Sequence, residues 1–263
     1  MLQLDKTRIA VREREYIDIL DLALRVIRAY AWPLLLAFAV GIVPMMVLNG
    51  WLLADLAERD FEVGFPAWYM FYMLLLILVE APLATAPATA YLGKAVFTER
   101  PERGELVREL RQSLPQLLLY QVLLRLWYIR WPYLNEVILL ERNPMGGKQA
   151  GGESTLDRSR VLHRGQADDL VARAFAVAVV GGLLFASIWL SMFFVRVILV
   201  SRWELAFDRP MYTLYYPLAL WIVVGYFTVV RFLSYLDLRI RREGWEVELW
   251  MRAERGRLAR RWK

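Results

Sequence analysis

Four long apolar runs divide the chain and set its architecture. Each is about as long as the roughly 20 residues that an α-helix needs to cross a bilayer. The clearest runs from Ala174 to Val195 without a charged residue. The pattern predicts membrane spans over residues 29–54, 66–97, 174–200 and 212–235. The predicted fold class is therefore an all-α polytopic membrane helical bundle, a single integral membrane domain over residues 1–263.

The segment before the first span has a different pattern, with charged and apolar residues mixed at a helical period. Residues 9–30 are predicted to form an amphipathic helix. Its apolar face is made by Tyr16, Ile19, Leu20, Ala23, Ile27 and Tyr30. Such a helix either covers other helices or lies in the membrane interface, and the pattern leaves both interpretations open.

Residues 114–140 are long enough to cross but are interrupted by polar and helix-breaking residues: Arg125, Arg130, Pro132 and Glu136. If this region crossed once, the arginine-rich end of the chain would face the side opposite the basic N-terminal segment, against the positive-inside rule. We therefore predict a re-entrant helical hairpin that turns near Trp131 and leaves on the side where it entered. Two interfacial helices lying flat are the alternative.

The charges between the spans predict the orientation. Six bases precede the first span, in residues 1–28, whereas the turn after it is net acidic. The rule places both termini in the cytoplasm, with the spans in the cytoplasmic membrane. Residues 143–169 are then a cytoplasmic loop, in which His163 is an exposed residue, and residues 245–263 form an amphipathic basic tail.

Composition supports a lipid-embedded protein. Hydrophobic residues make up 58% of the 263 residues, and there is no cysteine. Because the bases lie beside the apolar runs, anionic lipid headgroups are a better partner for them than nucleic acid. The residues predicted to contact headgroups are Arg239, Arg241, Arg242, Trp245 and Trp250.

Charged residues inside the membrane form the first candidate site. Glu80 falls near the middle of its span, where an ionised carboxylate is costly unless it is paired. We group it with Arg125, Arg130 and Glu136 as a candidate intramembrane polar network. The network is either a functional relay or a structural ion pair.

Small residues form the second candidate surface, a helix-packing ridge in the third span. They recur every four residues: Ala174, Ala178, Gly182 and Ala186. Such a row lets another helix approach closely. We expect the alanine-rich second half of residues 66–97 to meet this ridge, which would also suit a homo-oligomer.

Both ends of the bundle are similar to those of a known group of proteins. The stretches EYIDILDLALRVIRAYAWPLL and YLDLRIRREGWEVELWM resemble bacterial multi-pass proteins of the glycerophosphodiester-phosphodiesterase membrane-domain family and related uncharacterised membrane proteins. The closing element is Tyr235, Asp237, Arg239, Arg241, Glu243 and Gly244, and Leu236 departs from the family pattern, in which Tyr and Asp are adjacent. The resemblance implies a helical membrane domain with no established chemistry, and the phosphodiesterase activity, which belongs to a soluble domain, is not carried over to this chain.

Residues that could support catalysis are few, because the chain has one histidine and no cysteine. Asp168, Asp169 and Arg173 are similar to the start of the acidic motif of phosphatidyl-alcohol transferases, but no second acidic half follows. Acids that stabilise a helix start explain them better. We predict no enzyme activity, no cofactor and no metal site.

Three functional hypotheses follow from these patterns. The favoured one is a non-enzymatic membrane subunit or scaffold that docks other membrane or cytoplasmic proteins at the cytoplasmic face. The second is a transporter or channel component that uses Glu80 with Arg125 or Arg130. The third is a lipid-modifying membrane enzyme that uses Asp168 and Asp169.

Overall fold

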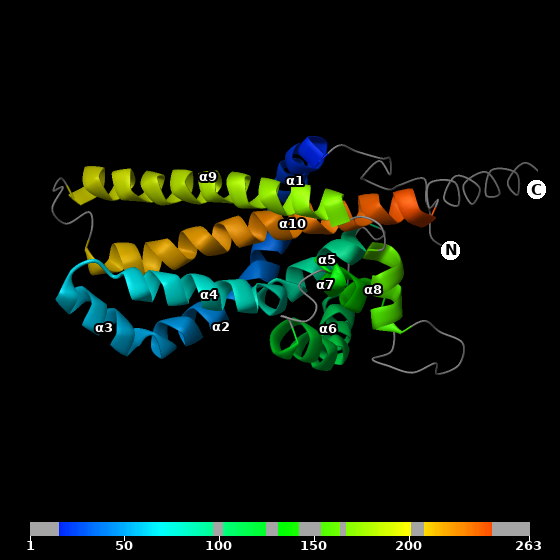
Figure 1. Ribbon diagram of the computed structural model, residues 1–263, viewed down its shortest axis with the longest axis horizontal. Helices are drawn as coiled ribbons and strands as arrows, with labels where there is room; N and C mark the ends of the chain where they lie inside the picture. The colour runs from blue at the N-terminus through cyan, green and yellow to red at the C-terminus, as the bar shows by residue number, and fades with distance from the viewer. Residues whose placement is uncertain are drawn as a thin grey trace, which may run out of the picture.

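The computed structural model describes residues 16–96, 102–124, 131–141, 154–163, 167–200 and 208–243, and regular structure in these ranges is helical throughout (Figure 1). Elements labelled η are π-helical. In chain order the elements are α1 (Tyr16–Ala29), α2 (Ala31–Leu52), α3 (Ala54–Val63), α4 (Ala67–Ala84), α5 (Ala86–Ala95), α6 (Arg103–Leu117), η2 (Leu118–Leu123), α7 (Leu134–Glu136), η3 (Val137–Glu141), α8 (Thr155–His163), α9 (Ala167–Val200), η5 (Met211–Tyr215) and α10 (Tyr216–Glu243).

Four of the described helices are long and apolar enough to cross a membrane: Ala31–Leu52, Ala67–Ala95, Ala174–Leu199 and Met211–Arg241. The predicted all-helical class and its four apolar spans are thereby confirmed. The second of these joins α4 to α5 through Thr85. The backbone N–H and the hydroxyl of Thr85 both donate to the carbonyl of Ala81, at 3.0 and 2.7 Å. These two hydrogen bonds keep the chain helical through the junction, which lies between Pro82 and Pro87.

The last helix, α10, lies at the centre of the bundle. It packs against α1, α2, α4, α5, α8 and α9. Its second half is buried on nearly every side, whereas α2 buries only Leu34 and Asn49. Apolar side chains exposed on α2 and α9 need no protein partner in a bilayer, because lipid tails are as apolar as leucine. The core of the protein is therefore built around α10.

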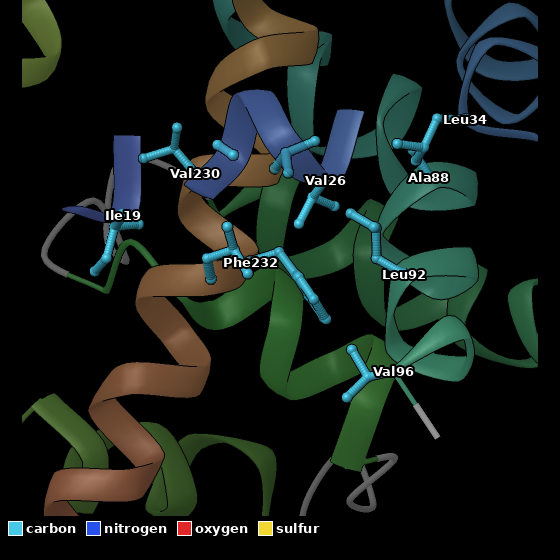
Figure 2. Close-up of a cluster of buried hydrophobic side chains, with 11 residues drawn as sticks. Ile19, Val26, Leu34, Ala88, Leu92, Val96, Val230 and Phe232 are labelled. Carbon is cyan, nitrogen blue, oxygen red and sulfur yellow. The ribbon is translucent and has the colours of Figure 1, made fainter. Parts of the chain in front are cut away.

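Helix α1 crosses over α10 and α5 (Figure 2). Ile19, Ala23 and Val26 are its buried residues, in a cluster that includes Leu92 of α5 and Phe232 of α10. The predicted apolar face is the one that packs. The structure thus shows α1 covering other helices, the first of the two interpretations that its pattern allows.

Small residues bring α2 and the second span into close contact. A Cβ built on Gly41 would lie 1.9 Å from the carbonyl oxygen of Ala84. The alanine-rich stretch of α5 is buried as well, with Ala86 and Ala88 fully covered. Because α5 packs against α2, α6, η3 and α10, these small side chains face helices other than α9.

The prediction that this stretch would meet the ridge on α9 is therefore wrong. Ala174, Ala178 and Gly182 are exposed, Ala186 is half-buried, and a Cβ on Gly182 would meet nothing within 4 Å. The packed face of α9 includes the neighbouring Gly181, where a Cβ would lie 3.2 Å from the Phe227 ring of α10. The predicted ridge lies beside the face that packs.

The interrupted region forms two helical arms in contact. The first arm is α6 with η2, and the second is α7 with η3; residues 125–130 between them lie outside the described ranges. Lys94 at the end of α5 pairs with Glu105 and Glu109 of α6, at 2.7 and 2.9 Å. Leu140 of the second arm packs on Gly93, also near the end of α5.

The far ends of the arms reach the junction of α4 with α5. Leu117 and Tyr120 of the first arm share a buried cluster with Leu134 of the second, with Ala86, and with the half-buried Leu83. Both arms therefore run beside α5. The first arm begins earlier than predicted, at Arg103 instead of residue 114.

The predicted loop over residues 143–169 is wrong in part, because Thr155–His163 forms α8. Ser154 caps the helix by accepting a hydrogen bond from the Asp157 N–H at 3.2 Å. Leu162 of α8 is buried in a cluster with Tyr235 of α10. His163 is the last residue of this helix, and Asp168 and Asp169 fall in the first turn of α9, as the helix-start interpretation of these acids requires.

The opposite end of the bundle, where α3 lies (Figure 1), is held by ion pairs. Arg196 of α9 makes a two-point contact with Asp208, including Nη2 to Oδ2 at 2.7 Å. The hydrogen bonds from the Arg196 guanidinium hold the pKa of Asp208 below its ordinary value. Arg209 pairs with Glu58 of α3 at 3.1 Å. These contacts join the ends of α9 and α10 to α3.

The close approach of α2 to α4 gives the first prediction. Gly41→Ala should lower the thermal unfolding midpoint of the detergent-solubilised protein, because the added methyl meets backbone, and overpacking typically costs about 1–3 kcal/mol. Gly50→Ala, in the same helix with nothing within 4 Å of its Cβ, is the matched control and should be neutral or stabilising. Equal midpoints for the two variants would contradict this packing.

The Arg196–Asp208 pair gives a pH prediction. Because the folded pKa of Asp208 is lowered, its contribution to stability should be complete above about pH 5 and should be lost as the pH falls through and below the ordinary aspartate pKa of about 3.9. The gap in unfolding midpoint between the wild type and Asp208→Asn should therefore shrink in acid. Glu58→Gln, which removes the more exposed pair, is the control. A gap that does not change with pH would rule the pair out as a source of stability.

Candidate functional site

The structure describes two of the four residues of the candidate intramembrane network, Glu80 and Glu136, and it gives them different partners. Glu80 of α4 accepts a hydrogen bond from Asn49 Nδ2 of α2 at 2.8 Å, and Asn49 is fully buried. An amide donor between two spans lowers the cost of a carboxyl group in hydrocarbon. Glu136 belongs to a separate group on α7. Arg125 and Arg130 lie outside the described residues.

Within the described part of the chain, the largest group of paired charges lies where the second arm and α8 meet α10. We call it the arginine–carboxylate seam. Its members are Glu136, Glu141, Arg158, Arg231, Tyr235 and Arg239.

Glu136 anchors the first half of the seam. Its side chain is completely buried and accepts a hydrogen bond from Arg231 Nε of α10 at 2.6 Å. The contact is made at one point only. Glu136 Oε2 and Arg231 Nη2 are buried without a hydrogen-bond partner among the described residues. A buried carboxylate of this kind depends on its arginine, because removing one partner leaves an uncompensated charge.

Glu141 anchors the second half and joins three elements. Its Oε2 accepts from Arg158 Nε of α8 at 2.5 Å, and its Oε1 accepts from the Tyr235 hydroxyl of α10 at 2.6 Å. Arg239 Nε lies 3.9 Å from the same Oε1. One carboxylate with two arginines and a phenol is a charge-assisted network, stronger than a neutral one.

Helix periodicity explains why these residues meet. Arg231, Tyr235 and Arg239 are four residues apart on α10 and so share one face. Glu136 and Glu141 are five residues apart, and the turn between them is π-helical, with i to i+5 hydrogen bonds that bring this spacing to one side. The π-helical turn therefore aligns two carboxylates with a straight row of donors.

The closing element of the family resemblance lies in and beside this seam. Tyr235 and Arg239 are seam residues, and Asp237 pairs with Arg241 at 3.0 Å. Two of the residues predicted to contact headgroups, Arg239 and Arg241, are therefore in ion pairs within the chain. The Arg242 side chain, Trp245 and Trp250 are outside the described residues.

The seam offers ion pairing across helices. Within the described residues, no group of three His, Cys, Asp or Glu side chains could hold a metal ion. The seam connects the hairpin arm and α8 to the last span through these ion pairs and hydrogen bonds. Its chemical role is to hold the hairpin, α8 and α10 in one fixed arrangement.

Sequence reasoning found part of the seam. It selected Glu136 and Arg239 but missed Glu141, Arg158 and Arg231. A signal for Arg231 was present, since Arg231, Tyr235 and Arg239 keep the four-residue spacing of one helix face. Nothing local marks Glu141 or Arg158, which lie 17 residues apart, and Tyr235 lies 94 residues from Glu141.

Comparisons of this chain with protein-family models, curated proteins and solved structures found no match. The resemblance of the chain ends to the membrane-domain family stays a prediction.

The seam gives a double-mutant prediction. Arg231→Met should strip the completely buried Glu136 of its partner and cost about 3–5 kcal/mol. Adding Glu136→Gln should recover part of the loss, because the stranded charge is then gone. Thermal or denaturant unfolding of the two single variants and the double variant in detergent measures the coupling. Strictly additive effects would show that the two side chains do not interact.

Proposed function

We propose that the protein is a non-enzymatic integral membrane subunit or scaffold that docks partner proteins at the cytoplasmic face of a bacterial inner membrane. The observation that carries the proposal is the arginine–carboxylate seam. It ties α7, η3 and α8 to the last span. These elements, together with α6, which packs against η3, and η2, which packs against α6, are here called the helical cap. A preformed cap on a membrane anchor is suited to presenting a fixed surface to another protein.

The charge distribution supports a cytoplasmic position for the cap. The cap lies at the end of the bundle opposite α3 (Figure 1), and α3 belongs to the net acidic turn. The basic segment before α1 and the arginines at the end of α10 favour the cytoplasmic side. Four crossings with a hairpin that returns to its own side keep both termini on that side.

The depth of the hairpin follows from the length of the second span. Ala67–Ala95 is 29 residues long, more than the roughly 20 that hydrocarbon requires. Counted from Ala67, Leu83 lies near the inner edge of the hydrocarbon and Lys94 lies beyond it. A hairpin based at Lys94 with its tip near Leu83 is re-entrant but shallow.

The other two hypotheses draw less support. Transport through Glu80 was proposed with arginine partners, and the partner that the structure gives it is the amide of Asn49. A lipid-modifying enzyme would use Asp168 and Asp169, but the position of both acids in the first turn of α9 already explains their presence. Both acids are suited there to the helix dipole.

Crosslinking from the cap tests the proposal. A photoreactive amino acid replaces Val161, an exposed residue of α8, in cells that carry the native partners; the control replaces Val63, an exposed residue of α3. We expect a defined adduct from position 161 that is lost in the Glu141→Gln background, and none from position 63. Adducts from position 63 only, or from neither position, would overturn docking at the cap.

The side of the membrane on which each end of the bundle lies is tested separately by cysteine labelling. Single-cysteine variants are suited to this test because the chain has no cysteine of its own. Val63→Cys and Val161→Cys variants are labelled in intact cells with a membrane-impermeant maleimide. Labelling of position 63 alone is expected. The reverse pattern would place the cap outside the cytoplasm.

A further inference from the structure

Helix α6 looks charge-balanced in the sequence, but the fold sorts its charges onto different sides. Glu105 and Glu109 both turn to Lys94, at 2.7 and 2.9 Å. Arg108 and Arg111 are exposed, and neither is in an ion pair within the described part of the chain. The remaining acid, Glu102, precedes the helix. The outward face of α6 is therefore basic.

An apolar edge runs beside these bases and continues into η2. Val107 and Leu118 flank Arg111 at helical spacings of four and seven residues, so the three share a side. Val107, Leu118 and Leu123 are 67%, 45% and 75% exposed. Exposed leucines next to arginines are typical of a helical segment at a membrane interface, with its leucines in the acyl region and its bases among headgroups.

With the hairpin at the depth proposed above, the outward face of α6 and η2 lies at the inner surface of the membrane. Segment η2 packs on α4, a candidate span. Arg111 lies seven residues before Leu118, which is about 10 Å along a helix. If the leucines of η2 reach the edge of the hydrocarbon, Arg108 and Arg111 are level with the lipid phosphates.

We propose that the outward face of α6 and η2 binds anionic phospholipid, with Arg108 and Arg111 on the headgroup phosphates and Leu118 and Leu123 among the acyl chains. Charge complementarity selects this occupant, because the acids of α6 pair with Lys94 and leave Arg108 and Arg111 outside any ion pair among the described residues. Headgroup contact was predicted for Arg239 and Arg241, but both are in ion pairs within the chain. The proposal assigns this contact to α6 instead. It rests on the proposed depth of the hairpin and not on protein docking.

Lipid preference of the purified protein tests the proposal. The full chain is placed in nanodiscs with equal phosphatidylglycerol and phosphatidylcholine, and the retained lipids are counted by native mass spectrometry. The wild type should prefer phosphatidylglycerol, and Arg108→Gln/Arg111→Gln should reduce the preference several-fold, since each base at the surface contributes on the order of fivefold. Arg25→Gln/Arg160→Gln removes the same charge from exposed arginines paired with Asp21 and Asp157, and should change little.

Equal effects of the two double variants would overturn the site, because net charge alone would then explain the preference. Nitroxides at positions 107, 118 and 123 of single-cysteine variants report depth independently. Labels at 118 and 123 should be reached by oxygen and not by a water-soluble nickel chelate, and the label at 107 by the chelate.

Chelate access at all three positions would overturn the depth, and with it the inference. Protection from both reagents would overturn the inference as well, because a second copy of this chain would then cover the face instead of lipid. Since only this chain and lipid are present, failure here leaves the crosslinking result for the cap unaffected, and the two proposals fail separately.

Discussion

A charged side chain beside hydrocarbon needs a partner. The last of the four candidate spans, which contains most of α10, carries three arginines. Arg231 and Arg239 find carboxylates on the second hairpin arm, and Arg241 finds Asp237 on its own helix. An arginine without these acids would have to reach water or headgroups. The pairing requirement therefore decides where the hairpin sits and explains why α10 is both the most charged span and the most enclosed. The rest of the fold is arranged around that helix.

How much of the fold the sequence predicts depends on how far apart along the chain the interacting residues lie. The four spans and the packed face of α1 follow from local periodicity, because lipid and core both select apolar residues at helical spacing. The prediction that the ridge on α9 packs against another helix is wrong because Gly181 and Gly182, although adjacent in sequence, lie on different faces of the helix. Gly181 faces α10, whereas a Cβ on Gly182, the ridge residue, would contact nothing within 4 Å. Period alone does not say which row meets a helix and which meets lipid.

Long-range pairing is the part that a single sequence does not carry. Glu141 bonds Tyr235, 94 residues away, and nothing near Glu141 indicates it. Helix α8 had a local sign in the Ser154 cap, but glycine-rich neighbours obscured it. In α6 the order of acids and bases was readable, yet their separation onto two sides depends on Lys94, contributed by α5.

The chain order of the seam bears on how the protein is made. Glu136 and Glu141 are synthesised before Arg231 and Arg239, about 90 to 100 residues earlier, which at translation speeds of 5–20 residues per second is a lead of roughly 5–20 seconds. The apolar α2 and α9 can enter lipid unaided, whereas the last span, with its arginines, emerges when its acidic partners are already in place. The order of synthesis thus supplies the carboxylates before the arginines that need them.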